Sequence, residues 1–351
     1  MYKQTTDRLI KFIADCPSSY HTIQTISNQL TASGFTELSE SEDWTLSAGN
    51  KYFVTRNLSS VIAFKIPEKL PSGFMLSASH SESPCFKIKP GFTLGGGSYV
   101  RLNTERYGGM IYSSWLDRPL SVAGRITVDT DCGIKTQLIN IDRDLVVIPN
   151  VAIHLSGKPG GGYELKPAKD LFPLYGSGST KTDLADVISA EAGISKDRIL
   201  GTDLFLYNRN YGSTWGSENE FFSAPRIDDL QCAFCTLEAF IESVSDNLST
   251  VSVYCVFDNE EVGSGTKQGA RSTFLSDVLH RIAFSLGLDE SEYIRLISSS
   301  MMLSADNGHA VHPNSPELSD PMIQPVINGG VLIKYNANQK YTTDAVSDGI
   351  F

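Results

Sequence analysis

Short apolar runs alternate with amphipathic stretches along much of the chain, which is the pattern of an α/β protein. Residues 5–33 have the periodicity of a helix pair or of one interrupted helix. Apolar runs rich in β-branched and aromatic residues predict strands, and longer amphipathic stretches predict helices. The predicted strands are 51–55, 60–65, 73–79, 251–257, 294–298 and 331–335, and the further predicted helices are 230–240 and 267–287.

The pattern of predicted secondary structure changes between about residue 90 and residue 212. Short strands such as 124–128 and 145–148 dominate there, among many Gly and Pro residues. Strands that alternate with helices and are interrupted once by β structure predict an α/β domain split by an inserted β-rich domain. We place the α/β domain at 1–90 and 213–351 and the insertion at 91–212.

Composition narrows the classes of function. With 351 residues, of which 41% are hydrophobic, the chain can bury a full core as two domains or as one domain with an insertion. A formal net charge of −11 without a clustered basic face disfavours nucleic acid as a partner. No apolar run approaches the roughly 20 residues of a membrane span, and the N-terminal segment has no secretory apolar region. We therefore expect a cytoplasmic protein with no membrane partner.

The six cysteines are scattered along the chain, which favours reduced thiols over a disulfide framework. Cys232 and Cys235 form a single CxxC pair inside the predicted helix 230–240, with no second pair or pair of histidines nearby. Packing in the core is favoured there over a zinc ribbon or a redox site.

Candidate ligand side chains follow the apolar runs at four places. They are His80 after 75–79, Asp228 and Asp229, Glu260 and Glu261 after 251–257, and Asp306 after 297–303. In open α/β sheets ligands bind beyond the carboxyl ends of the strands, so the four loops could converge. One His with several carboxylates is the ligand set of a hydrolytic two-metal site, for which zinc is favoured, with ions roughly 3.5–4 Å apart.

The adjacent glutamates suggest a division of roles, in which one Glu binds metal and the other manages the proton of a bound water. A solvated turn after the strand is the alternative. Glu82 is placed to accept the second imidazole N–H of His80 and to fix its tautomer. Taken alone, His80 could equally be a surface residue.

Together these segments resemble the M18 family of metalloaminopeptidases, the aspartyl aminopeptidase group, and most closely its bacterial type-2 members. The segments that carry the resemblance are 80–84 (HSESP), 107–109 (YGG), 114–120 (SWLDRPL), 148–155 (IPNVAIHL), 223–230 (SAPRIDDL), 258–264 (DNEEVGS), 304–306 (SAD) and 309–314 (HAVHPN). The resemblance implies a zinc-aminopeptidase-like mixed sheet flanked by helices.

By this resemblance four residues would be zinc ligands, with Asp228 bridging two ions, and Glu260 would be the general base. The ligands would be His80, Asp228, Glu261 and Asp306. Two zinc ions per subunit are implied, one of them exchangeable for cobalt or manganese.

Three further residues match positions that contact substrate. His154, in the inserted domain, would reach a substrate or oxyanion position in a neighbouring subunit, or would be a metal ligand. His309 and Lys334 would contact substrate; a role at a helix start for His309 and an ordinary strand lysine for Lys334 are the alternatives. We expect Asp117 and Arg118 to form an internal ion pair that shapes the inserted domain.

The implied activity is that of a metal-dependent aminopeptidase on peptides with a free N-terminus, acidic N-terminal residues being one candidate preference. The family also implies self-association into a homo-oligomer, often a dodecamer. Two alternatives remain: an oligomeric scaffold that has lost hydrolysis, and a dinuclear amidohydrolase acting on N-acyl amino acids.

The chain departs from the family pattern at two places. Glu82 stands where the family has Asp, and the longer side chain should keep the same role toward His80. Family members also continue past the last residue here and supply a final histidine ligand. We therefore expect a C-terminally truncated chain in which one metal lacks a protein ligand, ending in a helix that opens at Thr342 or Thr343 with Asp344 in its first turn.

Overall fold

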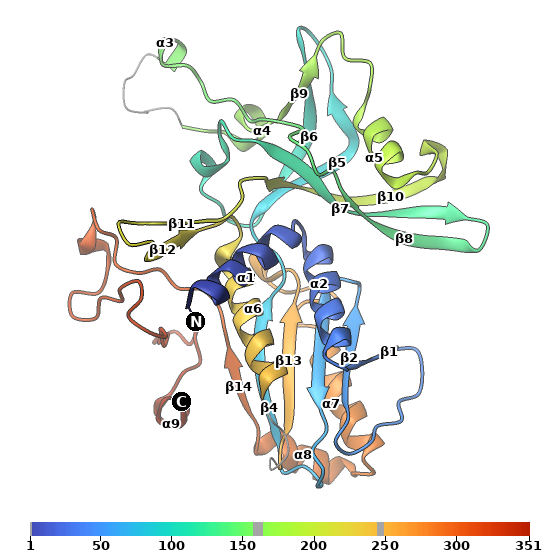
Figure 1. Cartoon of the computed structure of the whole chain (residues 1–351), viewed down its shortest axis with the longest axis vertical. Helices are drawn as coiled ribbons and strands as arrows, with labels where there is room; N and C mark the ends of the chain where they lie inside the picture. Colours follow the sequence, from blue (N-terminus) through green and yellow to red (C-terminus); the bar gives the residue numbers. More distant parts are fainter. Residues whose placement is uncertain (1, 157–163, 244–248) are drawn as a thin grey trace. The chain divides into compact units, whose positions relative to one another are not determined.

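The computed structural model describes residues 2–156, 164–243 and 249–351 (Figure 1). These residues form two compact units, 1–306 and 307–351. The first unit contains two six-stranded sheets and a two-stranded hairpin. The first sheet has, in spatial order, β1 (Thr36–Leu38), β2 (Lys51–Arg56), β3 (Ser60–Lys65), β13 (Val251–Phe257), β4 (Phe74–His80) and β14 (Met301–Ser304).

Five strands of the first sheet run in one direction and β3 runs against them. The register sets Phe257 of β13 opposite His80 of β4 and Ser304 of β14 opposite Ala78 of β4. The three strands therefore end at the same edge of the sheet, and the residues that follow β13 and β14 emerge beside His80.

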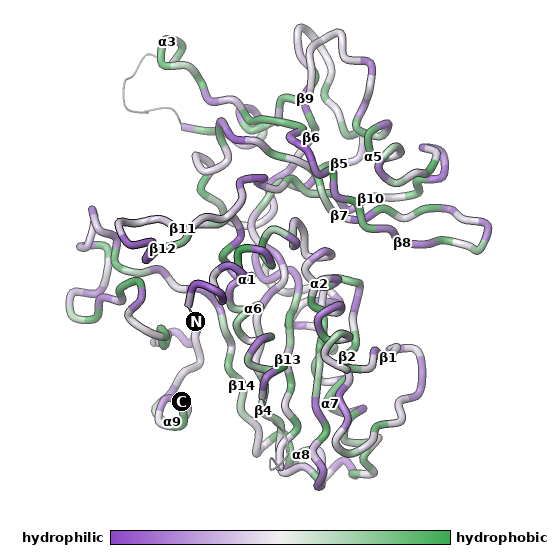
Figure 2. Tube along the Cα trace, viewed as in Figure 1, coloured by the Kyte–Doolittle hydropathy of each residue, from purple (hydrophilic) through white to green (hydrophobic). Residues whose placement is uncertain are grey.

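Helices cover both faces of this sheet. One face packs against α1 (Tyr2–Asp15), α2 (Ser19–Ala32) and α6 (Ile227–Glu242), and the other against α7 (Phe274–Ser285) and α8 (Glu290–Ser298). Along β13, Val253 and Cys255 face one core while Tyr254 faces the other, because side chains alternate across a strand. Hydrophobic residues accordingly recur along β13 and its neighbour β4 (Figure 2). The three-layer arrangement confirms the predicted α/β class.

The second sheet is antiparallel and is built from residues 85–208. Its spatial order is β8 (Gly133–Asn140), β7 (Leu120–Thr130), β10 (Ile199–Asn208), β5 (Cys85–Leu94), β6 (Tyr99–Tyr107) and β9 (Leu174–Ser177). Its core packs against α5 (Leu184–Ala192), which begins with a capping box between Asp183 and Asp186.

Shorter elements complete the chain. In the first unit they are η1 (Tyr112–Trp115), α3 (Ile153–Ser156), α4 (Pro167–Asp170), η2 (Lys196–Arg198), β11 (Ser213–Trp215), β12 (Phe221–Ser223) and η3 (Glu260–Val262). In the second unit they are η4 (Pro316–Leu318) and α9 (Ala345–Ile350). Among the helices of the described ranges, none combines the length and the apolar character that crossing a membrane requires.

Two of the predicted strands are wrong. Residues 294–298 belong to α8, because Asp289 caps a helix there and Tyr293 and Leu296, three residues apart, are the buried positions. Residues 331–335 form no strand, and the second unit, all of whose residues are described, has no strand that could pair with them.

Other boundaries and contacts also differ from the predictions. The helix predicted at 267–287 begins only at Phe274, and Asp344 is the N-cap of α9 rather than a residue of its first turn. Asp117 and Arg118 do not pair; the Asp117 carboxylate accepts the backbone N–H of Asn150 instead. The CxxC pair is not a core pair, since Cys232 is half-buried and Cys235 is exposed.

Candidate metal centre

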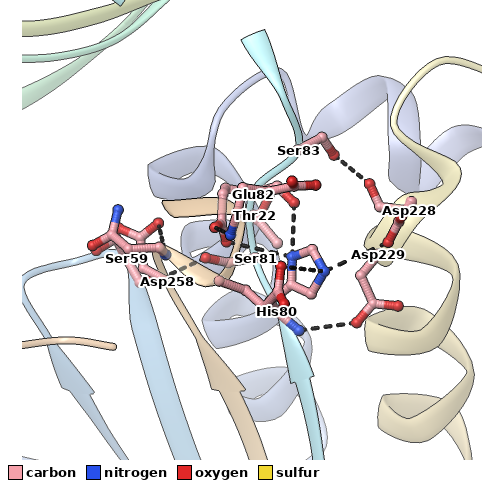
Figure 3. Close-up of polar contacts among 12 residues, drawn as sticks. Thr22, Ser59, His80, Ser81, Glu82, Ser83, Asp228, Asp229 and Asp258 are labelled. Atoms are coloured by element: carbon pink, nitrogen blue, oxygen red, sulfur yellow. Dashed lines mark hydrogen bonds and ion pairs between the residues drawn. The ribbon is translucent and has the colours of Figure 1, made fainter. Parts of the chain in front are cut away.

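His80, the last residue of β4, is the centre of the candidate site. It is buried, and Figure 3 shows it between Glu82 on one side and Asp228 and Asp229 on the other. Its Nδ1 lies 3.0 Å from the Glu82 carbonyl oxygen and 3.4 Å from Glu82 Oε2, while Nε2 lies 3.5 Å from Asp228 Oδ1. One ring nitrogen is therefore held by Glu82, and the other faces the acidic cluster.

Two groups of side chains bring potential ligand atoms within 4.8 Å of one another, and His80 belongs to both. The first group contains His80, Asp228, Asp229 and Asp306, and the second contains His80, Glu260 and Glu261. The elements explain this convergence: Asp228 and Asp229 lie at the start of α6, Glu260 and Glu261 open η3 after β13, and Asp306 follows β14. All four predicted ligands and the predicted base thus lie in the two groups.

Charge crowding shapes the protonation of the site. Burial alone would lower the pKa of His80, but the hydrogen bonds to Asp228 and Glu82 and the charges of Glu82 and Asp229 raise it to about 11. Burial raises the pKa of Glu261 to about 7, with a further contribution from the like charges of Asp228 and Glu260. Because these carboxylates repel one another at such short distances, a positive charge bound among them is favoured.

Asp229 is a site residue whose role the sequence did not predict. It is fully buried, and its Oδ2 accepts the backbone N–H of His80 at 3.0 Å, so it holds the end of β4. Burial raises the pKa of Asp229 to about 7 against the charge of His80 and a hydrogen bond from Cys232. The adjacent Asp228 and Asp229 were visible in the sequence; which of them is buried was not.

The loop after β13 is held by a second buried carboxylate. Burial, reinforced by the charge of Glu82, raises the pKa of Asp258. The side chain of Asp258 accepts the backbone N–H of Asn259, and its own backbone N–H is donated to Ser60 Oγ at 2.9 Å. These contacts fix the point where the chain leaves the sheet and turns to Glu260 and Glu261.

A cavity of about 840 Å³ borders this cluster. Glu82 and Asp228 form part of its wall, together with Tyr107 and Phe205 from the second sheet and Arg226. Both sheets therefore face the space beside the candidate ligands.

The remaining predicted residues lie outside the two ligand groups. His154 is exposed in α3. His309 and Lys334 belong to the second unit, where Lys334 Nζ donates to the Asn307 carbonyl at 2.8 Å and lies 5.2 Å from the centroid of the Tyr341 ring.

Comparisons with known proteins identify the family of the chain. The family model described as aminopeptidase I zinc metalloprotease (M18) matches residues 12–351. A probable M18 family aminopeptidase 2 from Clostridium acetobutylicum is 42% identical over 353 residues, covering 98% of this chain and 81% of that protein.

Solved structures show the same fold. The Ape4 chain of a complex with Nbr1 superposes with a TM-score of 0.94 at 35% identity, covering 99% of this chain and 71% of that one. The mApe1 dodecamer of S. cerevisiae gives a TM-score of 0.87 at 25% identity, and the match covers 99% of this chain and 82% of that one. The chain belongs to the M18 family of zinc metalloproteases and is an aminopeptidase of that family.

Proposed function

We propose that the chain removes N-terminal residues from peptides with the help of two zinc ions. The observation that carries this proposal is the placement of His80 in both ligand groups, at the edge where β4, β13 and β14 end. Imidazole and carboxylate ligands from separate loops suit Zn²⁺, so the residues present fit the metal of the family. Cobalt or manganese in one of the two positions is part of the same proposal.

His80, Asp228, Glu261 and Asp306 would hold the ions, with Asp228 shared between them. When bound, zinc lowers the pKa of water and polarises a carbonyl oxygen. Glu260 is exposed beside the cluster, with Oε2 4.0 Å from His80 Nε2, which suits a group that must meet substrate. Its carboxylate would accept a proton from the attacking water and return it to the amine that leaves the scissile bond.

Glu82 orients His80, and three other residues would serve the substrate. His309 and Lys334 would contact the N-terminal residue of the peptide, and a cationic Lys334 would favour an acidic side chain. His154 would reach the substrate or a metal, in its own or a neighbouring subunit.

We further propose that the chain works as a cytoplasmic homo-oligomer, and the dodecamer named for the mApe1 relative is the expected form. An inserted domain at 91–212 is part of the same proposal, and its support is the second sheet, whose strands run from residue 85 to residue 208. Neither the scaffold nor the amidohydrolase alternative gains support from the relatives, which are named aminopeptidases.

Glu260→Gln tests the assignment of the base. The substitution should lower kcat by about 10²- to 10⁴-fold, because it removes proton transfer, while metal content stays at the wild-type value. Glu191→Gln, an exposed change on α5, is the matched control and should leave both quantities unchanged. Loss of metal together with activity would contradict a role confined to proton transfer.

Two measurements on the unchanged protein test the rest. Metal content near two ions per chain supports the two-zinc site, whereas one ion contradicts it. Hydrolysis of peptides with a free amine but not of N-blocked peptides supports the aminopeptidase, and the reverse result supports the amidohydrolase.

A further inference from the structure

The turn that ends β6 touches both loops of the candidate metal centre, although β6 belongs to the second sheet. Tyr107, the last residue of β6, pairs with Cys85 of β5. A methyl group placed on the next residue, Gly108, would lie 3.0 Å from Glu261 Cβ and 3.5 Å from Pro84 Cα. The turn therefore packs directly between the loop that follows His80 and the loop that carries Glu261.

The side-chain hydroxyl of Tyr107 makes two hydrogen bonds, one to each loop. Its hydroxyl oxygen accepts from Asn259 Nδ2 at 2.8 Å and lies 3.3 Å from Glu82 Oε1. The Oδ1 of Asn259 accepts from Thr266 Oγ1 at 2.7 Å and from Gln268 Nε2 at 2.8 Å, and this orientation leaves its Nδ2 facing the tyrosine. Since the tyrosine oxygen accepts from Asn259, its own O–H is free to donate to the Glu82 carboxylate.

The Glu82 carboxylate passes this orientation on to His80. The side chain of Glu82 is buried, so its charge depends on donors within the protein. Oε1 receives the hydroxyl of Tyr107 and the backbone N–H of Glu261 at 3.1 Å. Oε2 then makes an ion-pair contact with His80 Nδ1 at 3.4 Å, beside the 3.0 Å hydrogen-bond distance from Nδ1 to the Glu82 backbone carbonyl.

We propose that Tyr107 is a positioning residue of the metal centre, which orients His80 through Glu82 and holds the loop of Glu260 and Glu261 through Asn259. Partners that orient metal ligands typically change metal affinity or activity by about 10- to 100-fold when they are removed. This inference rests on the proposed assignment of His80 and Glu261 as ligands.

Tyr107→Phe tests the proposal because it removes only the hydroxyl. The ring, which packs edge-on against Phe205 at 5.8 Å, remains. We expect zinc affinity, measured by competition with a chromophoric chelator, to fall about 10-fold or more, with kcat falling and KM nearly unchanged. Tyr112→Phe is the matched control: it removes a hydroxyl that accepts from Arg106 at 2.8 Å and should leave zinc affinity at the wild-type value.

A second measurement separates positioning from general support of the fold. In a Glu82→Gln background, Tyr107→Phe should lower zinc affinity by a smaller factor than in the wild-type background, because the part of its effect that acts through the Glu82 carboxylate is already lost while the part that acts through Asn259 remains. An equal fall in affinity in both backgrounds overturns the proposal, and so does unchanged affinity of Tyr107→Phe alone.

The variant His80→Ala tests the ligand assignment by itself, separately from the role of Tyr107. Retention of both ions by His80→Ala would mean that the ligand assignment, and with it the proposed function, is wrong. Loss of metal in His80→Ala with wild-type affinity in Tyr107→Phe would overturn only the role of Tyr107.

Discussion

The two sheets of residues 1–306 contribute to the candidate site in different ways. The first sheet has helices on both faces, and three of its strands end beside His80. The ends of these strands and the start of the covering helix α6, which carries Asp228, supply every candidate ligand of the described groups. The second sheet contributes none of the described ligand groups. It supplies Tyr107 and Gly108, which contact Glu82, Asn259 and Glu261.

The difference shows that supplying the ligands of a metal centre and orienting them are separate tasks, which different elements of the fold can perform. Parallel strands that end together place ligand loops side by side, which is a property of the topology. The orientation of each ligand is a separate requirement, because an imidazole or carboxylate can rotate about its own bonds. A neighbouring sheet that supplies no ligand can meet that requirement with one hydroxyl group, on Tyr107, and one close backbone approach, at Gly108.

The largest expected effect comes from removing a candidate ligand at the edge of the first sheet. Asp228→Asn should abolish metal retention at one position and lower the rate by about 10²-fold or more, since metal stabilisation of the transition state is worth several kcal/mol. The side chain of Asp228 is 55% exposed, so the free energy of unfolding of the metal-free protein should change little. Metal analysis, peptide hydrolysis and chemical denaturation measure these three quantities.

Asp129→Asn is the corresponding change in the second sheet, on the exposed side of β7. It should leave metal content and rate at their wild-type values. If Asp228→Asn behaves like Asp129→Asn, the division between the sheets is wrong.

A smaller effect is expected at Gly108, where the second sheet touches the site. Gly108 has φ +75°, and an alanine methyl would press on Glu261. Gly108→Ala should destabilise the fold by about 1 kcal/mol through its backbone and should also lower kcat by about 10-fold by displacing Glu261.

Gly287 provides the control because its φ of +77° is nearly the same and a methyl group there would meet nothing within 4 Å. Gly287→Ala should therefore lose similar stability without losing activity. Equal losses of activity in the two variants would show that Gly108 acts only through general stability.

The smallest effect concerns an ion pair of the second sheet. Asp203 lies 3.1 Å from Lys87 Nζ and 2.9 Å from an Arg125 nitrogen. Burial would raise the pKa of Asp203, but the hydrogen bonds and charges of these two partners lower it overall. Asp203→Asn should lower the free energy of unfolding by about 1 kcal/mol at pH 7, with metal content unchanged.

The pH dependence of the free energy of unfolding tests whether the charge of Asp203 causes this loss of stability. A folded-state pKa below the unfolded value of about 3.9 stabilises the fold above that pH and loses this effect as the pH falls through the folded-state pKa. The denaturation midpoints of wild type and Asp203→Asn should therefore converge on acidification. A constant difference down to pH 3 would assign the loss to packing instead of charge.

Much of the first sheet could be predicted from the sequence. The strands at 51–56, 60–65, 74–80 and 251–257 are apolar runs of high β propensity, and their burial in a sheet with helices on both faces follows from that composition. Ligand-type residues just past such runs are visible in the same way. Residues 294–298 were misread because local alternation of apolar residues does not distinguish a short strand from a capped helix with two buried positions.

The sequence by itself therefore determined the α/β class, the family and the residues available for a metal centre, since these depend on local apolar patterns and ordered motifs. Only the tertiary structure decided that Asp229 is buried and accepts the backbone N–H of His80, that the Asp117 carboxylate accepts the backbone N–H of Asn150, and that the Tyr107 hydroxyl reaches Glu82 and Asn259. These contacts join residues distant along the chain, and side-chain hydrogen bonds of a few ångströms depend on how whole sheets pack. No local pattern of hydrophobic and polar positions encodes such distances.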